Sequence, residues 1–290
     1  MKMAEDTKTK TFVEPGVLYV VPTPIGNLSD ITERARIVLA GADFVAAEDT
    51  RNTAHLLTLL GLKKTCVPYH EHNARAAGAH IVSELKAGKS CALVTDAGTP
   101  AVSDPGEQLV ALCAAEGVRV VPLPGACAAV CALSGAGLPS RRFAFEGFLP
   151  TKKSVRARYL ESLRGDTHTL VFYIAPHDAP RDLADLYEAL GDRRAALCRE
   201  LTKLNEEILR ERLSVLKDCL FTVRGEMALV VEGASAAESW ESLSVEEHVA
   251  LYVGQGMPEM AAIKAVAADR GLPKSEVYAR VKVKEEKADG

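Results

Sequence analysis

The stretch from Leu93 to Gly106 reads LVTDAGTPAVSDPG, and it gives the first indication of the fold. It joins the apolar run Cys91–Val94 to a helix-like pattern that begins at Glu107. The loop between them holds two Asp, two Gly and two Pro, and it lets main chain approach a ligand closely, because Gly lacks a Cβ and Pro fixes φ. Since ligands of α/β proteins bind beyond the carboxyl ends of strands, we expect this loop to form one wall of a binding site.

Short apolar runs alternate with helical patterns throughout the first half of the chain. Strands are expected at 17–21, 44–47, 65–68, 91–95 and 118–121, with helices between them. Such alternation is typical of βαβ units with a parallel sheet, which predicts an α/β fold. Each Gly/Pro-rich or acidic loop follows a strand, so these loops should gather at one edge of the sheet.

Local signals predict where the first helices begin and end. Asp30 followed by Glu33 has the spacing of a capping box, so Asp30 is the expected N-cap of the first helix. Gly41 should end that helix in a left-handed conformation, and Gly61 should close the next one.

A second mixed α/β domain is predicted from Phe143 onward. Its expected strands are 169–173, 195–198, 221–223 and 227–231, and its expected helices lie around 156–164, 180–190 and 206–218. Three short helices at 245–253, 260–268 and 274–283, separated by Gly turns, resemble a helix-turn-helix unit. We therefore expect a disordered tail (1–14), an N-terminal α/β domain (15–138), a C-terminal α/β domain (139–236) and a helical unit (244–286).

Composition limits the class of protein. The 290 residues carry a net charge of −4, so a nucleic-acid partner must be met by a local basic surface. No apolar run approaches the roughly 20 residues that cross a bilayer, and the polar segment Met1–Lys10 does not resemble a signal peptide. The seven cysteines are odd in number and form no CxxC pair, which predicts free thiols in a reducing cytoplasm.

The loop PTPIGN at 22–27 has neither the Gly-Lys-Ser/Thr of a Walker P-loop nor a GxGxxG pattern. Its two prolines donate no N–H group, so the loop suits an uncharged or cationic ligand group better than a phosphate. A rigid strand-to-helix turn without a ligand is the alternative interpretation.

Glu48, Asp49 and Arg51 concentrate three ionisable groups at the end of the second expected strand. Such a cluster can orient a substrate hydroxyl or accept its proton. A helix N-terminus whose acids suit the helix dipole is the alternative. His70 and His72 lie two residues apart with no Cys nearby, an incomplete ligand set, so we expect no metal site.

Between Arg141 and Arg164, seven basic residues stand against only Glu146 and Glu161. Basic side chains neutralise phosphates, and interleaved aromatic rings such as Phe148 stack on unpaired bases. A solvated helix face over core aromatics is the alternative. The expected RNA-binding residues are Arg141, Arg142, Lys152, Lys153, Arg156 and Arg158.

A series of short motifs resembles the tetrapyrrole methylase superfamily, and in particular its members that methylate ribosomal RNA. The motifs are PTPIGNL (22–28), EDTR (48–51), YHEHN (69–73), TDAGTPAVSDPG (95–106), PGA (124–126), FEGFLP (145–150), RELTK (199–203) and GE (225–226). The resemblance covers nearly the whole chain after about residue 15 and includes the terminal helices.

The resemblance implies two α/β domains with S-adenosylmethionine in a cleft between them, usually in a homodimer. It also implies 2′-O-methylation of a cytidine in the decoding centre of 16S rRNA. At 173–178 the chain reads YIAPHD where the family usually has YEAPHR, so a Glu is lost at Ile174 and the Arg is displaced to Arg181. The cofactor contacts implied by matching positions, many of them through main chain, are Pro24, Ala97, Gly98, Thr99, Val102, Cys127, Ala128, Ile174 and Leu201.

Methyl transfer from a sulfonium is an in-line displacement, so alignment of donor and acceptor supplies much of the acceleration. A ribose hydroxyl is a weak nucleophile until its proton is shared or removed. We expect Glu48 and Asp49 to do this while Arg51 positions ribose or phosphate, with no metal required. The candidate catalytic residues are Glu48, Asp49, Arg51, His72 and Lys203.

Two rival hypotheses remain at this point. One is a methyltransferase for a tetrapyrrole or another small molecule, which would need neither the basic segment nor the terminal helices. The other is a non-catalytic RNA-binding assembly factor, which would have no use for a cleft built from successive strand-end loops. The sequence also leaves open whether Asp96 or Asp104 contacts the ligand or only braces its turn.

Overall fold

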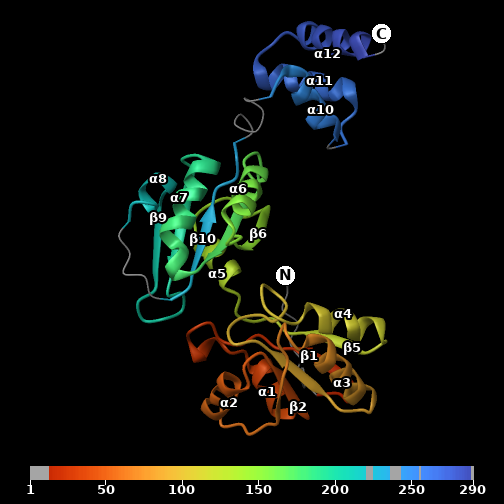
Figure 1. The fold of residues 1–290 in the computed structure, drawn as a ribbon, viewed down its shortest axis with the longest axis vertical. Helices are drawn as coiled ribbons and strands as arrows, with labels where there is room; N and C mark the ends of the chain where they lie inside the picture. The colour runs from red at the N-terminus through yellow and green to blue at the C-terminus, as the bar shows by residue number, and fades with distance from the viewer. Residues whose placement is uncertain (1–12, 220–224, 236–242, 255, 289–290) are drawn as a thin grey trace, which may run out of the picture. The chain divides into compact units, whose positions relative to one another are not determined.

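The computed structural model describes residues 13–219, 225–235, 243–254 and 256–288, which pack as two compact units (Figure 1). Unit 1 is the described part of Met1–Gly135 together with the short segments Cys198–Ile208 and Gly225–Ala228. Unit 2 holds the other described residues after Gly135. The expected tail lies mostly outside the described residues, and the expected domain boundaries stay a prediction.

Unit 1 is built on a parallel sheet of five strands in the order β3-β2-β4-β1-β5. The alternation of strands and helices predicted from the sequence is confirmed. The strands are β1 (Val17–Val20), β2 (Phe44–Ala47), β3 (Cys66–Pro68), β4 (Cys91–Val94) and β5 (Arg119–Pro122).

Helices cover both faces of this sheet, because successive strand residues point to opposite sides. Val17, Tyr19 and Ala92 pack with α1 (Glu33–Gly41) and α2 (Thr50–Leu59). Leu18, Val20 and Leu93 pack on the other face with α3 (Ala74–Lys86) and α4 (Glu107–Ala115). The central strands are thus buried on both sides, and α5 (Ala128–Gly135) follows β5.

The predicted start of α1 is wrong by two residues. Thr32 is the N-cap, and its hydroxyl oxygen accepts a hydrogen bond of 3.0 Å from Ala35 N, while Asp30 ends a separate 3-10 turn, η1 (Leu28–Asp30). Thr32 supplies the cap because its own oxygen meets the N–H three residues on, which is the usual capping geometry. Gly41 ends α1 without a left-handed φ, whereas Gly61 has φ +70° after α2, as expected for a helix-closing glycine.

A second sheet has the strand order β6-β7-β10-β8-β9. Its strands are β6 (Phe143–Phe148), β7 (Thr169–Ile174), β8 (Arg194–Arg199), β9 (Glu207–Arg212) and β10 (Met227–Val231). The helix predicted at 206–218 is wrong: β9 and the short α8 (Leu213–Leu216) occupy it. Glu, Leu and Arg favour helices, but sheet pairing overrides such propensities. The expected strand 221–223 lies outside the described residues.

The helices of unit 2 fall into two groups. The first, α6 (Lys153–Ser162), the 3-10 turn η2 (Pro176–Asp178) and α7 (Ala179–Leu190), accompanies the sheet strands in sequence. The second is α10 (Val245–Gly254), α11 (Glu259–Arg270) and α12 (Lys274–Ala288), which share a core of their own and confirm the three predicted helices.

The described residues bear on two expectations from composition, the absence of a membrane-spanning helix and the presence of free cysteines. None of their helices combines the length and the apolar character that crossing a membrane requires. All seven cysteines are free thiols; Cys91, Cys113 and Cys198 are buried and the other four are partly buried.

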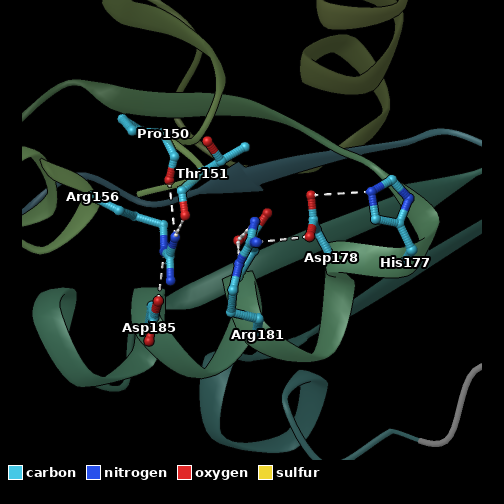
Figure 2. Close-up of polar contacts among 8 residues, drawn as sticks. Pro150, Thr151, Arg156, His177, Asp178, Arg181 and Asp185 are labelled. Carbon is cyan, nitrogen blue, oxygen red and sulfur yellow. Dashed lines mark hydrogen bonds and ion pairs between the residues drawn. The ribbon is translucent and has the colours of Figure 1, made fainter. Parts of the chain in front are cut away.

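Arg156 requires a correction, because it was expected to contact RNA. Its side chain is only 4% exposed, and its Nε donates to Asp185 Oδ2 at 2.6 Å (Figure 2). The guanidinium also donates to the carbonyl oxygens of Pro150 and Thr151, at 2.9 and 2.8 Å. Arg156 therefore fastens α6 to α7 and to the turn after β6, and we remove it from the RNA-binding set.

Arg156→Ala is expected to destabilise the protein by about 3 kcal/mol, because it leaves a carboxylate and two carbonyl groups without their donor. The matched control is Arg158→Ala on the exposed side of the same helix, with an expected effect within about 0.5 kcal/mol. Urea denaturation followed by circular dichroism measures both. Equal midpoints for the two variants would contradict this role for Arg156.

Candidate functional site

The loops after β1 and β4 are joined by main chain. Thr23 N donates to Gly98 O at 2.9 Å, and Gly98 N donates to Thr23 O at 3.1 Å, forming an isolated antiparallel bridge. The Thr23 hydroxyl, almost fully buried, donates to Thr95 O at 3.1 Å. Because β1 and β4 are parallel neighbours, their carboxyl ends bring these two loops to one edge, and the bridge fixes their spacing.

The loop after β5 locks onto the same two loops. Thr99 Oγ1 donates to Ala126 O at 2.8 Å, which ties the β4 loop to the β5 loop. Gly125 lies so close to Pro22 that a Cβ added to it would be 2.5 Å from the proline Cβ. The three loops predicted to share an edge are thus in direct contact, and together they carry Pro24, Ala97, Gly98, Thr99, Val102, Cys127 and Ala128.

Left-handed backbone at residues other than glycine is confined to two loops of unit 1 among the described residues. Ala101 and Ser103 have φ of +67° and +61°, and Glu200 and Thr202 have φ of +49° and +68°. Such conformations cost about 1–3 kcal/mol each and persist where the surroundings enforce them, often at functional sites. Both loops were already candidates from sequence.

The second of these loops packs against the loop after β1. Lys203 Nζ donates to Glu200 Oε1 at 2.9 Å, and a Cβ on Gly26 would lie 2.7 Å from Lys203 Cγ. A Cβ on Gly225 would overlap the Glu200 carboxylate. Gly26 and Gly225 therefore make room for the Glu200–Lys203 pair, which places the candidate Lys203 and its neighbour Leu201 beside the 22–27 loop.

Three carboxylates gather where β2 and β4 end. Glu48 Oε2 accepts from the buried Thr95 hydroxyl at 2.5 Å, and Asp96 Oδ2 accepts from Asn52 Nδ2 at 2.7 Å. The Thr95 side chain lowers the pKa of Asp104 and the charge of Glu48 raises it, so Asp104 belongs to the same cluster.

Asp104 has the most perturbed carboxyl group of this cluster. Burial, the largest cause, raises its pKa to about 6, and the nearby charges of Glu48, Glu226 and Asp96 push the pKa in the same direction. The sequence left the role of Asp104 open, and it placed Glu226 in the GE motif at 225–226 without making it a candidate site residue. The sequence signal that could have singled out Asp104 is its place in the turn SDPG (103–106), because a turn with Pro and Gly restricts the backbone that carries the acidic side chain.

Asp49 has the opposite character. It is the N-cap of α2, and its carboxylate is gripped by Arg51 through Nε at 3.1 Å and Nη2 at 2.6 Å. Those hydrogen bonds lower the pKa of Asp49 to about 2, which makes it a weak proton acceptor. The Arg51 side chain is 88% exposed, so it remains accessible to a substrate.

The remaining candidates occupy separate places. His72 is exposed and lies edge-on to His70, with ring centroids 6.1 Å apart. Among the described residues, no group of three or more His, Cys, Asp or Glu is placed to hold a metal ion. In unit 2, Ile174 is fully buried, at 0% exposure. Arg141, Arg142, Lys152, Lys153 and Arg158 are exposed.

Arg181, the arginine displaced from the family's usual position, is held within unit 2. Its Nη1 lies 2.7 Å from Asp178 Oδ1, and His177 approaches the same carboxylate at 3.5 Å (Figure 2). Its Nε donates to Asp182 Oδ1 at 2.9 Å. Arg181 therefore stabilises the start of α7.

Comparison with known proteins places the chain among methyltransferases. The family described as Tetrapyrrole (Corrin/Porphyrin) Methylases matches residues 17–217. The ribosomal RNA small subunit methyltransferase I of Halalkalibacterium halodurans is 45% identical over 275 residues, which cover 91% of this chain and 94% of the relative. The Bacillus subtilis protein of the same name is 44% identical over 93% of this chain and 95% of its own.

Solved structures support the fold alone, because their identity to this chain is low. The methyltransferase CobJ has a TM-score of 0.58 at 22% identity, covering 76% of this chain and 95% of its own. Uroporphyrin-III C-methyltransferase from Thermus thermophilus, solved with S-adenosylhomocysteine, has a TM-score of 0.52 at 19% identity, covering 74% of this chain and 96% of its own.

Gly125→Ala is expected to force the β5 loop away from Pro22, because the added Cβ meets a rigid ring at 2.5 Å. The expected cost is about 1–3 kcal/mol, with faster hydrogen exchange at the amides of Thr23 and Gly98. The control is Gly165→Ala, whose added Cβ meets nothing within 4 Å. Unchanged exchange at both amides would show that the three loops are not coupled.

Proposed function

Since the chain belongs to the ribosomal RNA small subunit methyltransferase I family of tetrapyrrole methylases, we propose that it methylates the ribose 2′-hydroxyl of a cytidine in the decoding centre of 16S rRNA, with S-adenosylmethionine as donor. The observation that carries this proposal is the joined set of three strand-end loops with carboxylates beside it. We also propose a cytoplasmic homodimer, as the resemblance implies.

The chemistry of these loops fits a sulfonium cofactor. Pro22 and Pro24 withhold N–H groups from a positive centre, and Glu48, Asp96 and Asp104 make the neighbourhood acidic. Thr202 Oγ1 is buried with no hydrogen-bond partner in the described structure, beside Gly26, so a bound ligand would satisfy it. When bound, S-adenosylmethionine supplies an activated methyl group.

The cofactor-binding residues of the proposal are those on the loops after β1, β4 and β5, joined by Leu201 of the same unit; the contact that the resemblance implies for Ile174 stays a prediction. Gly98 has no side chain, so its main chain can approach the ligand closely. The Thr23–Gly98 bridge keeps Pro24 at a fixed distance from Gly98. A preorganised cradle of this kind lowers the entropic cost of aligning donor and acceptor.

Within this frame we assign the proton acceptor to Asp104 rather than Asp49. A carboxylate with a pKa of about 6 is ionised at neutral pH and still accepts a proton, whereas one with a pKa of about 2 does so poorly. The charge of Glu48, which accepts from the Thr95 hydroxyl, helps to raise the pKa of Asp104 and so favours uptake of the ribose proton by Asp104. Asp49 then serves to orient Arg51 toward ribose or phosphate, while His72 and Lys203 remain available for substrate contact.

The decisive experiment incubates the protein with labelled S-adenosylmethionine and either 30S subunits or a porphyrinoid, and then maps the label. We expect label on a ribose 2′-oxygen of 16S rRNA. Label on the porphyrinoid would favour a small-molecule methyltransferase. Cofactor-independent binding to 30S without any transfer would favour a non-catalytic assembly factor. Either result contradicts the proposal.

Asp104→Asn is expected to lower kcat by about 10²–10⁴-fold, the range typical of a lost general base. In the wild type, kcat/KM should rise about tenfold per pH unit below pH 6 and level off above it, because only the ionised Asp104 accepts a proton. The variant should lose this limb of the profile. The control Asp49→Asn should keep it, and a lost limb in Asp49→Asn alone would return the base to Asp49.

The free energy of unfolding should fall with rising pH over the range in which kcat/KM rises. The folded state disfavours the charged form of Asp104, so stability from this group is present below about pH 4 and lost as the pH rises through about 6. Asparagine carries no such penalty. We expect Asp104→Asn to be more stable than the wild type at pH 8 by up to about 3 kcal/mol, with a correspondingly higher Tm, and to differ little from it at pH 4.

A further inference from the structure

Unit 2 contains a cavity of about 500 Å³ that is lined by five arginines, namely Arg141, Arg142, Arg193, Arg194 and Arg212. Only two carboxylates, Asp192 and Glu232, share the lining, so the cavity holds an excess of three positive charges. The chain as a whole has a net charge of −4, which makes this excess a local feature. A concave surface lined by one sign of charge concentrates ligands of the opposite sign.

Three of the arginines are held in place by their neighbours. Arg194 donates through Nε to Glu232 Oε2 at 2.9 Å, and Arg212 donates through Nη1 to Asp192 O at 2.6 Å. Arg193 is 7% exposed and donates to the carbonyl oxygens of Arg164 and Glu232. These contacts fix the guanidinium groups before any ligand arrives, which reduces the entropy lost on binding.

The other two arginines are available. Arg141 and Arg142 lie in the exposed turn just before β6, and neither side chain makes a hydrogen bond or ion pair with another described residue. A guanidinium group presents a planar fork of N–H donors that matches the oxygens of a phosphate. Two such forks beside a positively charged floor suit a ligand with more than one phosphate.

The size of the cavity distinguishes a polymer from a single ion. At about 30 Å³ per water, 500 Å³ has room for ~17 waters, so one inorganic phosphate fills only a small part of it. We propose that this cavity binds consecutive backbone phosphates of RNA. This inference rests on the proposed function for the identity of the RNA.

The lining of the cavity predicts what this site does for catalysis. None of the residues proposed for catalysis or for the cofactor cradle lines it. Its phosphate contacts therefore act on binding of the RNA, and losing them should raise KM while kcat stays unchanged.

The test is the double variant Arg141→Ala/Arg142→Ala, compared with Arg34→Ala/Arg36→Ala, which removes two exposed arginines from α1. Binding to 30S subunits is measured from 50 to 200 mM salt, with methyl transfer and affinity for S-adenosylmethionine measured in parallel. We expect the cavity variant to bind about tenfold more weakly and its slope of log K against log salt to fall by about 1.4–1.8, at 0.7–0.9 per phosphate. The control variant should keep the wild-type slope.

An unchanged slope in the cavity variant would overturn the assignment, even if methyl transfer to rRNA is observed. Binding of inorganic phosphate is measured as well. If the cavity variant loses phosphate binding but keeps the wild-type slope of log K against log salt, the cavity binds a free anion, and the RNA assignment is overturned. A reduced slope in a protein that transfers no methyl group to rRNA would uphold the cavity as an RNA site while the proposed function fails. The two hypotheses are thereby separated.

Discussion

The candidate site depends on the pair of main-chain hydrogen bonds between Thr23 and Gly98. Parallel strands bring loops to a common edge, but they leave the loops free to move apart. The bridge removes that freedom, and the buried Thr23 hydroxyl on Thr95 O extends it to the start of the β4 loop. Contacts of the β5 loop, through Thr99 and through Gly125 against Pro22, are then built on an already fixed pair.

The same loops bring acidic side chains of unit 1 together and so determine their proton affinities. Thr23 holds the Thr95 carbonyl oxygen, the Thr95 hydroxyl donates to Glu48, and the charge of Glu48 helps to raise the pKa of Asp104. Asp49 lies next to Glu48 in sequence but is neutralised by Arg51, so its proton affinity falls instead of rising. In unit 2 the arginine-lined cavity has the opposite sign. One chain thus presents an acidic surface suited to a cationic cofactor and a basic surface suited to a polyanion.

Sequence patterns predicted most of the framework of unit 1 and the loops of its site. Strand and helix alternation and the glycine after α2 are local signals, and they were confirmed. The errors arose where tertiary contacts decide: β9 forms from helix-favouring residues because it pairs in a sheet, and Arg156 is buried by Asp185 on another helix. The raised pKa of Asp104 depends on burial and on carboxylates distant in sequence. The packing of Gly225 against Glu200 likewise has no local signature.

The central claim is that the joined loops after β1, β4 and β5 form the cofactor cradle. A crystal structure of the protein with S-adenosylhomocysteine tests it most directly. We expect the ligand to contact main chain at Pro24, Gly98 and Ala128 while both Thr23–Gly98 hydrogen bonds persist. A ligand bound away from these loops, or a complex in which the bridge is broken, would contradict it.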